Sequence, residues 1–295
     1  MNLDKPVIIL GAPRSGTTFL GDLLATHSHL AFANEPSPIW RYGNEHRSDC
    51  LRPEWLTESK RRYIRERFER IVTENEKTRL LEKTPQNCLR IPFVEAVFPD
   101  AKYVHILRDP VETILSIRRM WDTNTSGFRG VRFSQRLKEM TLAQAPRYAA
   151  QFLKRAWGKA TGTRTVMWGP LLPGIEKMAR EMDLLEVAAL QWRACTEAAC
   201  LIGRTLPPER YREIELAELD EAKLRETLEF LELPSESELL GAFRTEYSSS
   251  RASHHRAKAT PEQLKLIESF IAPTLSWLEK RLGDPACDGT NRQYG

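Results

Sequence analysis

The stretch VIILGAPRSGTTFL, residues 7–20, joins a short apolar run to a glycine-rich loop. The run VIIL is β-branched and bounded by Pro6 and Gly11, which is typical of a buried parallel strand. The residues after the loop, TTFLGDLLATH, carry apolar side chains at helical spacing. The loop therefore lies between a strand and a helix, where backbone N–H groups and a helix N-terminus can bind an anion.

The loop departs from the nucleoside triphosphate pattern G-x-x-x-x-G-K-[ST] at one position. Gly11 and Gly16 have the required spacing and Thr18 occupies the Ser/Thr position, but Thr17 stands where the lysine belongs. Arg14 lies inside the loop. In nucleoside triphosphatases that lysine contacts the β- and γ-phosphates, so this loop lacks a usual ligand of the γ-phosphate. A sulfuryl group, with one negative charge where a terminal phosphoryl carries about two, fits better.

Strand and helix patterns alternate along the rest of the chain. Strands are predicted at 78–83, 101–107 and 210–216, and helices at 56–72, 88–98, 110–121, 175–203, 218–233 and 261–282. This alternation predicts an α/β fold, a single P-loop-like domain with a central, mostly parallel sheet flanked by helices. We expect one domain over residues 1–283, with an irregular acceptor-specificity segment or lid at 123–174, and a flexible tail at 284–295.

Composition excludes several classes of protein. The chain has 295 residues and a formal charge of +4, too mild to predict a nucleic-acid binder. Its five cysteines have no metal-ligand spacing and suggest no disulfide framework. No apolar run is long enough to predict a membrane span, and the N-terminus has no signal-peptide pattern. A cytoplasmic location is the expectation.

Two motifs together resemble one known family. GAPRSGTTFL is similar to the 5′-phosphosulfate loop of sulfotransferases that use 3′-phosphoadenosine 5′-phosphosulfate (PAPS), in the P-R-S-G-T-T subgroup with tyrosylprotein sulfotransferases and many bacterial enzymes. In HILRDPVETILSIRR, Arg108 and Ser116 resemble the family's 3′-phosphate pair, an arginine that ends a strand and a serine eight residues later. The planar fork of an arginine suits a phosphate.

The resemblance implies a set of site residues. Glu35, 21 residues after Arg14, matches a catalytic base, and Lys83 matches a lysine that contacts the transferring group. Catalytic roles thus fall on Glu35, Lys83 and Arg14. The implied donor-binding residues are Pro13, Arg14, Ser15, Gly16, Thr17, Thr18, Arg108, Ser116, Arg256 and Lys258, with the last two in a basic loop that aligns only loosely.

Alternatives remain at several of these positions. Glu35 could cap a helix or pair with Arg41, and Lys83 could be a solvated strand end. PAPS is the implied donor, 3′,5′-adenosine bisphosphate (PAP) the product, and no metal is expected. The acceptor stays open among small molecules, glycans, lipids and peptides, with residues 37–47 and 123–174 as candidate pocket walls.

Two rival functions also stay open. One is a P-loop nucleotide kinase or other phosphotransferase, and the other is a nucleotide-binding protein without catalysis. Oligomeric state is not predicted, a homodimer being one option.

Overall fold

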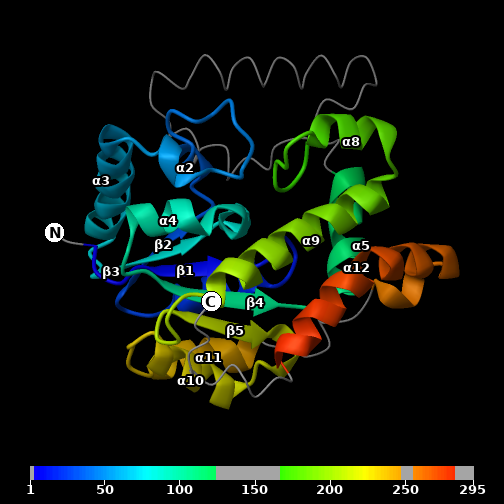
Figure 1. Cartoon of the computed structure of the whole chain (residues 1–295). Coiled ribbons are helices and arrows are strands. Elements are labelled where there is room, and N and C mark those ends of the chain that lie inside the picture. Colours follow the sequence, from blue (N-terminus) through cyan, green and yellow to red (C-terminus); the bar gives the residue numbers. More distant parts are fainter. Residues whose placement is uncertain (1–2, 124–166, 247–254, 283–295) are drawn as a thin grey trace, which may run out of the picture.

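The protein is built around a parallel β-sheet. The computed structural model describes residues 3–123, 167–246 and 255–282. Its strands are β1 (Val7–Leu10), β2 (Leu30–Asn34), β3 (Arg79–Lys83), β4 (Lys102–Leu107) and β5 (Tyr211–Glu215). In the described residues they form one five-stranded sheet in the order β2-β3-β1-β4-β5, and all its pairs are parallel (Figure 1). The predicted α/β architecture is confirmed.

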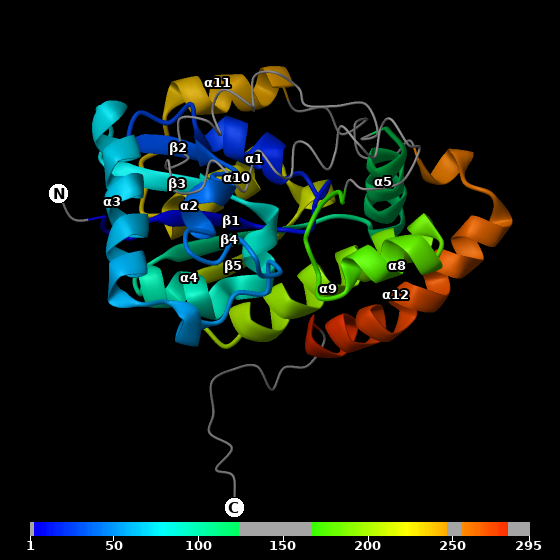
Figure 2. The same cartoon turned by 90° about the horizontal axis from the view of Figure 1, so that it is seen from above.

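Helices cover both faces of this sheet. One layer contains α3 (Glu58–Glu74), α4 (Ile91–Val97) and α9 (Leu184–Gly203), and the other contains α1 (Thr17–Leu24), α10 (Glu221–Phe230) and α11 (Ser237–Glu246). Beside α9 lie α5 (Pro110–Thr123), α8 (Ile175–Glu181) and α12 (Pro261–Leu282) (Figure 2). Short connections include α2 (Ser37–Trp40) and the 3-10 helices η1 (Pro53–Trp55), η2 (Pro85–Arg90), η4 (Leu216–Glu218) and η6 (Arg256–Lys258).

The central position of β1 explains why all four of its residues are apolar. Ile8 and Leu10 pack in the core under α3, α4 and α9, whereas Val7 and Ile9 pack against α1, α10 and α11. All four side chains are fully buried. A strand covered on both faces needs an apolar residue at every position, which is why VIIL shows no alternation.

The structure adds elements that the sequence patterns did not reveal, among them one strand of the sheet. Strand β2 has the sequence LAFAN, whose alanines and terminal Asn34 carry little strand signal. It is a strand because its backbone pairs with β3 from Leu30, opposite Arg79, to Asn34, opposite Lys83. Helix α11 was likewise not predicted.

The single helix predicted over 175–203 is two helices. Helix α8 ends at Glu181, and Asp183 caps the start of α9 by accepting a hydrogen bond from the Leu185 N–H. Glu186 completes a capping box by accepting from the Asp183 N–H at 3.0 Å. The pattern D-L-L-E was the overlooked helix-start signal.

The predicted domain boundaries stay a prediction. The tail 284–295 and most of the segment 123–174 lie outside the described residues. In the ranges that are described, none of the helices is both long enough and apolar enough to cross a bilayer.

Candidate active site

The predicted site residues lie where the parallel strands end. The glycine-rich loop follows β1, Glu35 follows β2, Lys83 is the last residue of β3, and Arg108 follows β4. Because parallel strands end on one edge of a sheet, this order brings chain-distant residues together. The edge is formed mainly by β3, β1 and β4, which are neighbours in the sheet.

The loop after β1 makes a tight turn with little room for side chains. Gly11 has φ of 156°, and a Cβ there would lie 2.5 Å from Ser15 Oγ and 2.8 Å from the Ile106 carbonyl oxygen. Gly16, with φ of 104°, directly precedes α1. Arg14 has φ of 73°, a left-handed backbone that costs a non-glycine residue about 1 kcal/mol or more. The turn therefore places the N-terminus of α1 against the end of β1.

The amide groups of the loop divide into two kinds. The Ser15 N–H donates to the Ala12 carbonyl at 3.1 Å, so in this conformation it closes the turn instead of facing a ligand. The assignment of Ser15 to donor binding stays a prediction. The first N–H groups of α1, from Thr17 onward, have no acceptor inside the helix. Ser15 Oγ is buried and has no hydrogen-bond partner among the described residues.

Glu35, Lys83 and Thr18 form one cluster. Lys83 Nζ donates to Glu35 Oε1 at 2.8 Å and to Thr18 Oγ1 at 3.2 Å. The lysine side chain is fully buried, whereas the side chain of Glu35 is 21% exposed. Glu35 has φ of 56°, and its N–H donates to the Lys83 carbonyl at 2.8 Å. The pair thus offers an accessible carboxylate beside an ammonium group at the start of α1.

This geometry bears on the two alternatives for these residues. Arg41 pairs with Asp49, at 2.7 Å, and the described ion pair of Glu35 is with Lys83. The cap position of α2 is Pro36, not Glu35. Lys83 is buried, so it is not a solvated strand end.

The predicted 3′-phosphate pair lies next to the loop. Arg14 Nε donates to Ser116 Oγ at 3.1 Å, and Arg108 Nη1 donates to the Arg14 carbonyl at 3.0 Å. Ser116 is on α5 and only 4% exposed, so it is not a surface serine. Arg14 therefore connects the two regions that the sequence motifs predicted separately.

The basic segment reaches the same region through Glu112 of α5. The carboxylate of Glu112 accepts hydrogen bonds from the N–H groups of His255 at 3.0 Å and Arg256 at 2.8 Å. Arg108 Nη2 lies 3.5 Å from the same carboxylate. Burial lowers the pKa of His255, and the positive charges of Arg108 and nearby arginines lower it further, while Glu112 raises it. Lys258 is exposed and makes no described side-chain contact with the loop.

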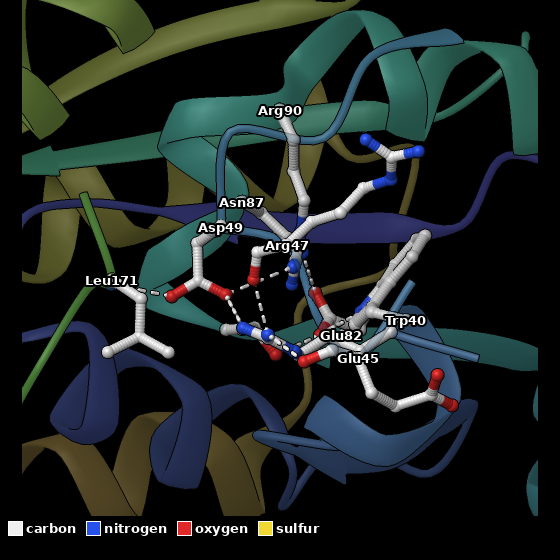
Figure 3. A network of polar contacts seen from close by, with 10 residues as sticks. Trp40, Glu45, Arg47, Asp49, Glu82, Asn87, Arg90 and Leu171 are labelled. Carbon is white, nitrogen blue, oxygen red and sulfur yellow. Dashed lines mark hydrogen bonds and ion pairs between the residues drawn. The ribbon is translucent and has the colours of Figure 1, made fainter. Parts of the chain in front are cut away.

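A buried hydrogen-bond network that the sequence did not predict surrounds the residue before Lys83. Glu82, the preceding residue, is fully buried and accepts hydrogen bonds from Trp40 Nε1 at 2.8 Å, Asn87 Nδ2 at 2.7 Å and the Thr84 hydroxyl (Figure 3). Burial raises the pKa of Glu82 to about 7, against the hydrogen bonds from Thr84 and Trp40 that lower it. The acidic residue inside the strand pattern LLEK was the sequence signal that could have predicted this buried network.

The same network extends to the segment after α2. Arg90 Nε donates to Asn87 Oδ1 at 2.8 Å, and its Nη1 lies 3.7 Å from Asp49 (Figure 3). Asp49 also pairs with Arg41 and accepts from the Leu171 N–H at 2.7 Å. Burial lowers the pKa of Arg90 to about 10. These contacts fix the predicted pocket wall 37–47 against η2.

The aromatic residues of that wall are accounted for by packing. Trp40 is fully buried between Phe68 and Phe98, with ring centroids at 5.0 and 6.0 Å. Tyr42 stacks on Tyr63 at 3.7 Å. Trp168 packs against the core, and Trp157 lies outside the described residues.

A second buried cluster joins β4, β5 and α9. His105, Cys200 and Glu213 place their ligand atoms within 4.8 Å of one another. However, Arg204 binds both oxygens of Glu213 at 2.8 Å. The Tyr211 hydroxyl bridges Glu213, at 2.8 Å, and His105 Nδ1, at 2.7 Å. Because Arg204 and Tyr211 already bind the Glu213 carboxylate, we interpret the cluster as a contact between α9 and strands β4 and β5.

Comparisons with solved structures extend over nearly the whole chain. The sulfotransferase domain from the curacin biosynthetic pathway has a TM-score of 0.54 at 17% identity, covering 92% of this chain and 99% of that one. The sulfotransferase STF9 of Mycobacterium avium has a TM-score of 0.54 at 14% identity, covering 94% and 77%. A sulfotransferase of Alicyclobacillus acidocaldarius has a TM-score of 0.51 at 15% identity, covering 94% of each chain. These likenesses concern the fold.

Sequence comparisons give the family. An uncharacterized protein of Aquifex aeolicus (strain VF5) is 23% identical over 312 residues, covering 95% of this chain but 33% of the relative, so the chain spans about a third of that protein's length. The family model described as the sulfotransferase family matches residues 6–164, more than half of the chain and the part that carries the loop, Glu35, Lys83, Arg108 and Ser116. The chain therefore belongs to the sulfotransferase family.

Proposed function

We propose that the protein transfers a sulfuryl group from PAPS to an acceptor hydroxyl or amine by in-line displacement. The observation that carries this proposal is the contact of Lys83 with both Glu35, at 2.8 Å, and Thr18, at 3.2 Å, at the start of α1. It joins a carboxylate that can accept a proton to an ammonium group that can stabilise a leaving anion. Family membership supports the same reaction class.

The residues present fit a phosphosulfate. A Cβ at Gly11 would collide with Ser15 and Ile106, so only glycine allows the tight turn that brings the loop and the start of α1 together. The buried Ser15 hydroxyl has no partner in the described residues and can donate to a phosphate oxygen. The N-terminus of α1 adds N–H groups and a partial positive charge.

The 3′-phosphate of the donor is assigned to Arg108 and Ser116. Both contact Arg14, Ser116 through its hydroxyl and Arg108 by donating to the Arg14 carbonyl, so this guanidinium group and hydroxyl lie beside the loop. A guanidinium binds two phosphate oxygens at once, which suits a monoester phosphate. This second phosphate site is what separates PAPS from ATP in the proposal.

The chemical step needs few protein groups. The donor supplies the sulfuryl group and a good leaving group, and the acceptor oxygen forms the new bond to sulfur. Glu35 takes the acceptor proton, a role worth about 10²–10⁴ in rate. Lys83 donates to the 5′-phosphate oxygen that receives the electron pair of the broken S–O bond, and Arg14 offsets charge on the sulfuryl oxygens.

The ion pair between Lys83 and Glu35 implies that the donor binds before Glu35 acts as a base. With the carboxylate bound to Lys83 Nζ, its charge is partly neutralised. A donor oxygen that competes for Nζ releases the carboxylate to act as a base. The accessible side of Glu35, 21% of the side chain, is where the acceptor approaches in this proposal.

The rival kinase function is disfavoured by one contact. A P-loop kinase needs an acidic residue after a strand to hold magnesium. Asp109 is the residue in that position, but its Oδ1 accepts the Glu112 N–H at 2.8 Å and so opens α5. Its other carboxylate oxygen, Oδ2, lies 3.4 Å from Arg256 Nη1.

Ligand-dependent thermal stability tests the donor. Adenosine 3′,5′-bisphosphate should raise the melting temperature because it binds the folded chain only, and Mg·ATP should raise it far less. Stabilisation by Mg·ATP alone would overturn the proposal. Incubation with [³⁵S]PAPS and representative glycans, lipids, peptides and phenols then identifies the acceptor class.

A Glu35→Gln variant separates an enzyme from a binder. It should bind the bisphosphate within about threefold of the wild type and lose about 10²-fold or more in turnover. Unchanged turnover would remove Glu35 as the base.

A further inference from the structure

Glu112 places a buried carboxylate beside the proposed donor site. Its side chain is 3% exposed and lies on the first turn of α5, four residues after Arg108. A buried carboxylate is unfavourable unless charges and hydrogen bonds compensate it. The compensation comes from the Arg108 guanidinium and from two main-chain N–H groups, those of His255 and Arg256.

An anion at this position is unexpected if the site binds a phosphate. A carboxylate repels a phosphate group, and like charges across a binding site lower affinity. Both oxygens of Glu112 already accept hydrogen bonds from the chain, Oε1 from Arg256 N–H and Oε2 from His255 N–H. The geometry therefore gives Glu112 an indirect role instead of a contact with the donor.

The contacts of Glu112 hold a basic turn in place. We define the 255–258 turn as His255 with η6, Arg256–Lys258. Its Arg256 side chain pairs with Asp109, the residue before α5, at 3.4 Å between groups that are 55% and 43% exposed. Such an exposed ion pair contributes little to stability. The two partly buried main-chain hydrogen bonds to Glu112 are the stronger described contacts between the turn and α5.

We propose that Glu112 is a positioning residue that docks the 255–258 turn onto the start of α5, so that Arg256 joins Arg108 and Ser116 around the 3′-phosphate of the donor. This inference rests on the proposed function. It assigns to an acidic residue a favourable effect on binding of an anion. Simple electrostatics gives the opposite sign, because removing a negative charge should strengthen phosphate binding.

The experiment measures selectivity for the 3′-phosphate. Isothermal titration gives the dissociation constants of adenosine 3′,5′-bisphosphate and adenosine 5′-phosphate, and their ratio defines the selectivity. The set of proteins is the wild type, Glu112→Ala, Glu112→Gln, Arg256→Ala and the double variant of Glu112→Ala with Arg256→Ala. Glu221→Gln on α10 is the control, because it makes the same charge change in an exposed cluster with Arg225 and Arg244.

The expected results follow from the contacts. Glu112→Ala should lower the selectivity about tenfold or more, equivalent to about 1.4 kcal/mol, with binding of the 5′-phosphate within about threefold of the wild type. Glu112→Gln should lose less, because its amide oxygen still accepts one N–H. The double variant with Arg256→Ala should lose little more than either single variant, because both act through the same turn.

The outcomes separate the two proposals. A wild type without selectivity contradicts the proposed function itself. A selective wild type whose selectivity is unchanged or higher in Glu112→Gln and Glu112→Ala overturns the positioning role and leaves the function standing. If Glu112→Ala does not fold, Glu112→Gln and hydrogen exchange at the His255 and Arg256 amides decide: faster exchange with lost selectivity supports the role, and unchanged exchange contradicts it.

Discussion

Two residues of the proposed machinery have a backbone that side chains rarely adopt. Arg14 and Glu35 have φ of 73° and 56°. Such strain costs about 1–3 kcal/mol each and persists only where the surroundings impose it. Here the Gly11 turn imposes it on Arg14, and the hydrogen bond from Glu35 N–H to the end of β3 imposes it on Glu35. With these backbones, Arg14 contacts Ser116 and Glu35 contacts Lys83.

Replacing Lys83 tests the charge at the end of β3. Lys83→Met keeps the buried volume but removes the ammonium group that contacts Glu35 and Thr18. Turnover should fall about 10²–10³-fold, with bisphosphate binding within a few fold. Lys102→Met is the matched control, because Lys102 is also a buried lysine ion-paired to a glutamate, Glu232, but it begins β4 at the other end of the strand. Equal losses in the two variants would refute a catalytic role.

The tight turn at Gly11 predicts a steric effect. Gly11→Ala places a Cβ 2.8 Å from the Ile106 carbonyl, which belongs to β4 and cannot move freely. The variant should lose bisphosphate binding and melt at lower temperature. Gly241→Ala, in α11 with no atom within 4 Å of the added Cβ, should instead be neutral or stabilise by up to about 1 kcal/mol. If Gly11→Ala retained bisphosphate binding in a titration, the proposed binding of the donor phosphate by the loop 11–18 would be contradicted.

At the scale of the element, the end of β3 makes side-chain contacts on both faces of the sheet. Lys83 contacts Thr18 of α1 on one side, while Glu82 contacts Trp40 and Asn87 on the other. Successive residues of a strand point to opposite faces, so one strand end carries a proposed catalytic group and its buried support. Glu82 connects β3 to η2 and to α2, and α2 begins two residues after Glu35.

The buried carboxyl of Glu82 predicts a pH dependence of stability. Its folded-state pKa of about 7 lies above the ordinary 4.5, so between these values the folded chain retains a proton that the unfolded chain has lost. This contribution is present below pH 4.5 and lost as the pH rises to 7, on the order of 3 kcal/mol in the free energy of unfolding. Relative to Glu82→Gln, the wild type should therefore lose stability across this range in urea titrations. Parallel curves for the two proteins would mean that Glu82 titrates normally.

For the whole molecule, the proposed site depends on segments far apart in the chain. The loop 11–18, residues 108–116 and the 255–258 turn meet only because β1 lies between β3 and β4 and because α5 binds the turn. Hydrogen exchange should therefore slow in all three segments at one common bisphosphate concentration. Adenosine 5′-phosphate should protect mainly the loop 11–18. Protection of the loop alone by both nucleotides would contradict a shared site.

Sequence patterns predicted the parts with local signals. The glycine spacing of Gly11 and Gly16 between an apolar run and a helical stripe was enough to predict the loop and its strand. The contact between Arg14 and Ser116 needed the strand order, which no local pattern encodes. Glu112 was missed because an acidic residue four positions after an arginine is typical of an exposed helical ion pair. Its partners are main-chain amides, which every residue but proline carries.

The central place of β1 also governs how the chain acquires its binding competence. Val7 pairs with Leu81 on one side and with Lys102 on the other, so the turn at Gly11 can close only after β3 and β4 have been synthesised and have docked. Closing such long loops costs entropy before any contact compensates it, which slows the formation of parallel sheets. During refolding, nucleotide affinity should thus emerge among the last properties, after collapse and helix formation.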